Sequence, residues 1–155
     1  MLSVARYYIR DLQHAEDVMI TAFYKAFTRM HQFKKEGNFE GWLRKIIVNE
    51  ALSFLRRNNR LVFTETDELL DSPEPQQVQQ DLEGAEEIQT WIDQLPENQK
   101  IVFILFAIEG YTHKEIAKTL KMPTGTSRSY LSRARVALQK KWNDSNLKKN
   151  EKATS

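Results

Sequence analysis

The C-terminal quarter of the chain carries the pattern that most restricts its fold. Residues 111–141 read YTHKEIAKTLKMPTGTSRSYLSRARVALQKK. This stretch predicts a short helix that begins with a capping box between Thr112 and Glu115. A turn over residues 122–125 follows, and Thr124 is the expected cap of a second helix. Two helices joined in this way form a helix-turn-helix, which places its second helix in the major groove of DNA.

The second of these helices is expected to have two different faces. At about 100° per residue, one side forms an apolar, buried stripe, made of Ser127, Leu131, Ala134 and Leu138. The remaining surface is basic and rich in hydroxyl groups, and its candidates for DNA binding are Thr126, Arg128, Ser129, Ser132 and Arg133. Arginine can pair bidentately with guanine, and serine and threonine can bond bases or phosphates.

Charge is distributed in three blocks along the chain of 155 residues. Residues 1–60 have a net charge of +5, residues 61–90 have −9 with no Lys or Arg, and residues 91–155 have +6. Two basic segments around an acidic one are expected when both ends meet a polyanion. The acidic stretch also contains Ser72-Pro73-Glu74-Pro75 and several glutamines, which favours a flexible linker. Whether its acidity has a function or is only solvated stays open.

Both flanking segments have helical periodicity. Upstream, a predicted core stripe repeats at three- and four-residue steps and consists of Ala15, Val18, Met19, Ala22, Phe23, Ala26, Phe27 and Met30. A loop over residues 31–37 precedes Asn38, the expected cap of a helix that buries Phe39, Trp42, Leu43, Ile46 and Ile47. Downstream, a helix ends at Pro96, and the next helix, over 97–109, is apolar on all sides in its centre at 101–108 and ends at Gly110. A strand pattern is limited to residues 61–63.

We therefore predict an all-α protein of two small helical domains joined by an acidic flexible linker. The expected boundaries are 1–60 for the first domain, 61–86 for the linker, 87–143 for the helix-turn-helix domain and 144–155 for a disordered tail. Cysteine is absent, the three histidines are scattered, and no glycine-rich phosphate loop occurs. No apolar run is long enough to span a membrane, and the first ten residues do not resemble a secretory leader. These features favour a cytoplasmic, non-enzymatic protein without cofactor, metal, small-molecule substrate or membrane insertion.

Motifs in the N-terminal segment and in the C-terminal segment resemble those of one protein family. The run from Leu95-Pro96 through Gly125–Arg135 looks like the −35 domain of an extracytoplasmic-function (ECF) sigma factor of the sigma-70 family. The run Ala15-Glu16-Asp17, followed by Phe39-x-x-Trp42-Leu43-x-x-Ile46, Asn49 and Arg56-Arg57, looks like the −10 domain of that family. The two sets of motifs occur in the family's order and cover nearly the whole chain.

The resemblance implies a dissociable specificity subunit that binds bacterial core RNA polymerase and promoter DNA and is held by an anti-sigma factor. Residues expected at the polymerase surface are Asp17, Ile20, Thr21 and Tyr24. Residues expected at the −10 element are Lys34, Phe39, Trp42, Lys45, Asn49, Arg56 and Arg57. The −35 contacts fall on the helix face already described. Aromatic side chains stack on unpaired bases and cations hold the backbone, so these residue types suit promoter melting.

Three departures from the family pattern keep two alternatives open. Val18-Met19-Ile20-Thr21 replaces a more polar run after Asp17, Ser53 stands where the family usually has Asp, and most of the family's first helix is absent before Met1, so we expect an incomplete N-terminal helix. The alternatives are a stand-alone helix-turn-helix regulator and a sigma-like decoy that interacts with a regulator without reading a promoter.

Overall fold

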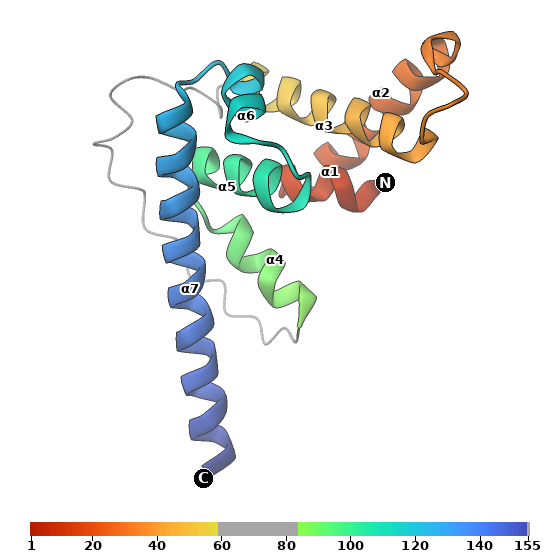
Figure 1. The fold of residues 1–155 in the computed structure, drawn as a ribbon. Helices are drawn as coiled ribbons and strands as arrows, with labels where there is room; N and C mark the ends of the chain where they lie inside the picture. Colours follow the sequence, from red (N-terminus) through yellow and green to blue (C-terminus); the bar gives the residue numbers. More distant parts are fainter. Residues whose placement is uncertain (59–83, 155) are drawn as a thin grey trace. The chain divides into compact units, whose positions relative to one another are not determined.

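The computed structural model describes residues 1–58 and 84–154, and within these ranges the chain forms helices and turns with no β-strand (Figure 1). It divides into two compact units, residues 1–62 and 63–155. The predicted all-α class is confirmed. The expected strand pattern at 61–63 and nearly all of the acidic linker lie outside the described residues.

Three α-helices and one 3₁₀ turn build the N-terminal unit: α1 (Leu2–Tyr8), α2 (Leu12–Thr28), the 3₁₀ helix Met30–Gln32 and α3 (Phe39–Arg57). Asp11 caps α2 by accepting a hydrogen bond from the amide of His14. The side-chain oxygen of Asn38 accepts from the amides of Glu40 at 3.0 Å and Gly41 at 3.4 Å. Asn38 therefore caps α3 as predicted, because its side chain satisfies amides that have no partner within the helix.

Small residues bring α2 against its neighbours. Ala15, Ala22 and Ala26 are buried on one side of α2 together with Val18. The larger side chains of the predicted stripe are not part of this core, because Phe23, Phe27 and Met30 are exposed, Phe27 to 79%. The prediction of one continuous core face was therefore wrong at these positions. Alanines let the helix backbones approach closely, and the bulky side chains are left on the outer surface of α2.

The C-terminal unit contains α4 (Ala85–Asp93), α5 (Glu97–Phe103), a π-helical turn (Ile104–Ile108), α6 (His113–Leu120) and α7 (Thr124–Thr154). Its core is centred on the apolar segment that the sequence indicates, with Ile101, Val102, Ile104 and Leu105 fully buried. The predicted single α-helix over 97–109 instead widens into the π-helical turn. Gly110 follows with a φ of 74°, a conformation that glycine adopts without steric cost.

The turn between α6 and α7 differs in detail from the prediction. Thr112 and Glu115 form the expected capping box, with both reciprocal bonds present. The left-handed residue of the turn is Lys121, whose φ is 54°, and Gly125 lies inside α7. Thr124 is the first residue of α7, and the amide of Ser127 donates to the carbonyl of Pro123. The prediction that Thr124 caps this helix was therefore wrong.

The expected disordered tail at 144–155 is helical as far as Thr154. Contacts with α4 supply the physical reason. The rings of Trp91 and Trp142 meet edge to face at 6.4 Å. The Ser145 hydroxyl donates to Glu87 at 2.8 Å, and the Lys149 ammonium lies 3.5 Å from the same carboxylate. Tertiary contacts of this kind stabilise helices that have weak intrinsic signals.

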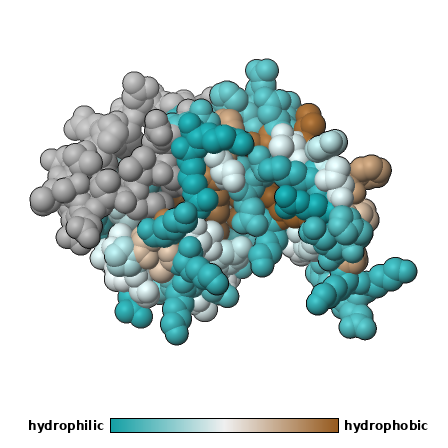
Figure 2. Space-filling view, turned by 90° about the horizontal axis from the view of Figure 1, so that it is seen from above, coloured by the Kyte–Doolittle hydropathy of each residue, from teal (hydrophilic) through white to brown (hydrophobic). Residues whose placement is uncertain are grey.

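Most of the visible surface is hydrophilic, with apolar side chains interspersed among the polar ones (Figure 2). None of the helices in the described ranges is long and apolar enough to cross a membrane.

Candidate nucleic-acid interface

The helix-turn-helix unit presents a basic face on the first turns of α7. The side chains of Arg128, Ser132 and Arg133 are exposed, and those of Thr126 and Ser129 are half-buried. On the other side of the helix the buried residues are Ser127, Tyr130, Leu131 and Ala134, while the predicted Leu138 is half-buried. The five predicted −35 residues are thus at least partly accessible, and the arrangement suits both phosphate contacts and base readout.

A second candidate face lies on α3 of the N-terminal unit. At about 100° per residue, Trp42, Lys45, Asn49 and Arg56 fall within an arc of about 60°. Lys45, Asn49 and Arg56 are exposed, and Trp42 is half-buried. An aromatic ring, an amide and two cations along one helix face are the groups that hold unpaired nucleotides. The structure brings these four predicted −10 residues together on one side of the helix.

An aromatic cluster sits at the start of this face. The Phe33 ring meets the Phe39 ring edge to face at 5.4 Å and lies 5.4 Å from the Trp42 ring, and Phe39 and Trp42 are 5.8 Å apart. Phe39 is 43% exposed and Trp42 half-buried, so the prediction that α3 buries both rings was wrong. The exposed Lys34 follows Phe33 directly. The cluster offers partly exposed ring surface beside a cation.

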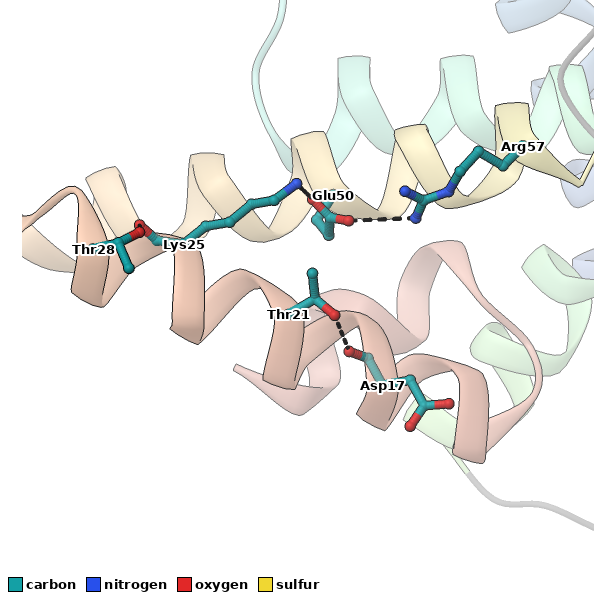
Figure 3. A network of polar contacts seen from close by, with 6 residues as sticks. All are labelled: Asp17, Thr21, Lys25, Thr28, Glu50 and Arg57. Atoms are coloured by element: carbon teal, nitrogen blue, oxygen red, sulfur yellow. Dashed lines mark hydrogen bonds and ion pairs between the residues drawn. The ribbon is translucent and has the colours of Figure 1, made fainter.

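The remaining predicted −10 residue, Arg57, belongs to an ionic network around the buried Glu50 carboxylate, which the sequence did not predict (Figure 3). The Glu50 side chain is only 4% exposed. One of its carboxylate oxygens accepts a hydrogen bond from Lys25 of α2, and the other lies 3.4 Å from the Arg57 guanidinium. Glu50 therefore ties α2 to the end of α3 while Arg57 stays 63% exposed. The available signal was a charged residue on the core side of a predicted helix, because a buried charge needs an oppositely charged partner.

The predicted polymerase-binding residues lie on the outer surface of α2. Asp17, Ile20, Thr21 and Tyr24 are all exposed, Tyr24 to 70%. The Thr21 hydroxyl donates to the Asp17 carbonyl at 2.9 Å, one turn earlier in the same helix (Figure 3). Phe23 and Phe27 of the same helix are exposed as well, and contiguous exposed apolar side chains can mark sites of protein association.

Across residues 1–58 and 84–154, no group of three or more histidine, aspartate or glutamate side chains is arranged to hold a metal ion.

Two helical units, one with an exposed recognition helix and the other with an aromatic and basic helix face, define a two-domain DNA-binding protein. Comparison with known families makes this specific. Residues 1–61 match the family described as Sigma-70 region 2, and residues 85–138 match Sigma-70, region 4. The RNA polymerase sigma-H factor of Pseudomonas aeruginosa is 31% identical over 147 residues, which cover 86% of this chain and 75% of that protein. The chain belongs to the sigma-70 family, as a sigma factor of the ECF type.

Further relatives agree with this assignment. The ECF RNA polymerase sigma factor SigE of Mycolicibacterium smegmatis is 32% identical over 139 residues, covering 86% of this chain and 54% of that protein. A solved complex of the sigma factor RpoE with the anti-sigma factor NepR from Bartonella quintana has a TM-score of 0.58 at 24% identity. That match covers 90% of this chain and 87% of the solved one, and it supports the fold.

Proposed function

We propose that this chain directs core RNA polymerase to promoters by reading the −35 element with α7 and the −10 element with α3. The observation that carries the proposal is the presence of two separate nucleic-acid-type faces, one in each unit of a sigma-70 family member. Thr126, Arg128, Ser129, Ser132 and Arg133 contact the −35 duplex.

In the N-terminal unit, the aromatic cluster and the α3 face hold the unpaired −10 strand. Its residues are Lys34, Phe39, Trp42, Lys45, Asn49, Arg56 and Arg57. Promoter melting then draws its free energy from binding, because stacking a base on an aromatic ring contributes about 1–3 kcal/mol. The chain needs no catalytic group, nucleotide or metal of its own for this, and it acts in the cytoplasm with the polymerase.

The exposed surface of α2 is the proposed contact with core polymerase, through Asp17, Ile20, Thr21 and Tyr24. Its apolar character supports a protein partner rather than DNA. We also assign an anti-sigma factor to this chain as a regulator. Support comes from the similar fold of a sigma factor that was solved with one.

Pull-down of bacterial core polymerase by this chain, followed by run-off transcription, tests the proposal. Initiation from selected promoters is the expected result. Arg128→Ala is expected to weaken −35-dependent initiation about 5- to 100-fold, the effect of losing one bidentate base contact. Lys140→Ala, another exposed cation of α7 beyond the proposed face, is the matched control and should change initiation less than twofold.

Two other results would redirect the assignment. A chain that shifts duplex DNA alone and does not bind polymerase is a stand-alone regulator. A chain that binds an anti-sigma factor but neither polymerase nor DNA is a decoy. The run Val18-Met19-Ile20-Thr21, in place of a more polar one after Asp17, is the observation that favours the decoy, because it changes the surface proposed for polymerase binding.

A further inference from the structure

Ser127 is a fully buried hydroxyl in the first turns of the recognition helix. It lies between Thr126 and Arg128, which belong to the proposed DNA face, but its own side chain points into the protein and is 0% exposed. Burying a hydroxyl costs free energy unless it forms a hydrogen bond. The partner is His113, the first residue of α6, whose Nδ1 lies 2.9 Å from the Ser127 oxygen.

The imidazole of His113 is held from a second direction as well. It stacks on the ring of Phe106, with centroids 4.7 Å apart and an interplanar angle of 22°. Phe106 belongs to the π-helical turn, so the widened turn contributes a ring to this contact. The guanidinium of Arg135, two turns beyond Ser127 on α7, lies 5.4 Å from the centroid of the same Phe106 ring. Four side chains thus join the π-helical turn, α6 and α7.

Burial and nearby positive charge favour the neutral form of this imidazole. Burial lowers the pKa of His113, and the positive charges of Arg128 and Arg135 lower it further. A neutral imidazole has one nitrogen that donates and one that accepts, so it suits a serine hydroxyl in either role. The contact is therefore a hydrogen bond between neutral groups at neutral pH.

Two side-chain contacts at different positions along a helix axis fix both the rotation of the helix about that axis and its tilt. Ser127 and Arg135 are eight residues apart and lie on neighbouring sides of α7, at about 80° to each other. Rotation of α7 about its axis would break the hydrogen bond and move Arg135 off the Phe106 ring. Base readout depends on such orientation, because bidentate contacts tolerate little displacement.

We propose that His113 is a positioning residue for −35 recognition, which sets the orientation of α7 through Ser127. The inference rests on the proposed function, since it assumes that this face of α7 reads the −35 element. His113 itself need not touch DNA. Its role is to fix where Thr126, Arg128 and Ser129 point.

The test uses reconstituted holoenzyme and two duplexes, one with a selected −35 element and one with that element scrambled. The ratio of the two dissociation constants measures specificity. Ser127→Ala and His113→Ala are each expected to lower this ratio about five- to tenfold, comparable to loss of one base contact. The double variant should be no worse than either single variant, because both remove the same hydrogen bond.

Conservative and control variants separate positioning from folding. Ser127→Thr keeps the hydroxyl and His113→Asn keeps a polar atom close to the position of Nδ1, so both should retain most of the ratio. Ser145→Ala removes another hydrogen-bonded serine of α7, 2.8 Å from Glu87 and outside the DNA face, and should leave the ratio unchanged. Thermal melting of every variant gives the folded fraction, to which the binding data are normalised.

The outcomes are distinguishable. If Ser127→Ala and His113→Ala reduce thermal stability but keep the wild-type ratio, the contact is only structural and the inference is wrong. Additive effects of the two variants would also overturn it. If wild-type holoenzyme shows no preference for the −35 duplex, the proposed function itself fails, and this inference fails with it.

Discussion

At the scale of single residues, the Glu50 carboxylate and its two partners differ in their exposure to solvent. It is buried, while Lys25 and Arg57 are both partly exposed (Figure 3). Removing the Glu50 carboxylate leaves two cationic side chains that can reorient into solvent. Among the described residues, removing Lys25 leaves the buried carboxylate with the longer 3.4 Å contact to Arg57. Loss of one member of an ion pair is costly mainly when the other charge stays buried.

We therefore expect Lys25→Met to destabilise the N-terminal unit by about 3 kcal/mol and Glu50→Gln by about 1 kcal/mol. Native-state hydrogen exchange of α3 amides measures both values without requiring the two units to unfold together. The double variant Lys25→Met/Glu50→Gln should recover part of the loss from Lys25→Met. Equal costs for the two single variants would contradict this explanation.

His113 gives the C-terminal unit a pH dependence of defined sign. Burial, Arg128 and Arg135 hold the pKa of His113 below its ordinary value of 6.5. Between that value and the lower folded pKa, the unfolded chain binds more protons than the folded chain. The free energy of unfolding should therefore be highest above about pH 6.5 and fall as the pH drops through this window. Chemical denaturation of wild type and His113→Gln at several pH values measures the difference, and the variant should have the shallower slope.

Buried polar residues show what hydrophobic patterning cannot predict. Glu50 and Ser127 occupy core-side positions on their helices, and each has a partner on another helix, 25 residues away for Glu50 and 14 for Ser127. Periodicity assigns such positions to the core but does not identify the partner that makes burial of a polar group favourable. The exposed Phe23 and Phe27 are the opposite case, since their spacing fits a core face that Ala22 and Ala26 fill instead.

At the scale of whole elements, the C-terminal half of α7 depends on α4. Trp142 packs against Trp91, and Ser145 and Lys149 both contact Glu87. Lys141 of α7 also donates a hydrogen bond to the side chain of Gln94, the residue that follows α4. Burial lowers the pKa of the Lys141 ammonium group.

We expect the double variant Glu87→Gln/Trp142→Ala to increase hydrogen exchange over residues 143–154 about tenfold. Loss of an aromatic pair and a charge-assisted hydrogen bond corresponds to roughly 1–3 kcal/mol. Leu147→Ala changes an exposed side chain of the same segment and is the control. Unchanged exchange in the double variant would show that the segment is helical without α4.

Elements with local signals were predictable. Asn38 and the pair Thr112 and Glu115 cap their helices as the sequence predicts, because each cap joins atoms within three residues. The accessible side of α7 also follows from helical spacing, whereas the residues of the α3 face were predicted only from the resemblance to the family. The π-helical turn at 104–108 and the helical end of α7 were not predictable, since both depend on packing against distant segments.

At the scale of the whole molecule, the sign of the charge alternates along the chain between the two units and the segment that connects them. The basic segments at 1–60 and 91–155 are separated by residues 61–90, which carry −9. We expect a negative segment on the same chain to oppose the approach of DNA to either basic unit by electrostatic repulsion. This repulsion is screened beyond about 10 Å at 0.1 M salt.

Neutralising part of that segment tests its effect. The variant Asp67→Asn/Glu68→Gln/Asp71→Asn raises the net charge from +2 to +5. We expect its free chain to bind non-specific duplex DNA several-fold more tightly at low salt, with the gain lost as salt rises. Fluorescence anisotropy over a salt series measures this. Gln76→Ala/Gln77→Ala changes the same segment without changing charge and should match wild type.

The salt series also decides between two roles for the acidity. A gain confined to low salt means that the segment acts through its charge on DNA approaching the basic units. Identical affinities of variant and wild type at every salt concentration would contradict this, because a solvated linker leaves the basic faces unaffected.

Run-off transcription with the same variant then isolates any effect inside the polymerase. If initiation falls while promoter binding by holoenzyme is unchanged, the acidic residues act after DNA binding, and electrostatic repulsion of free DNA does not explain their presence.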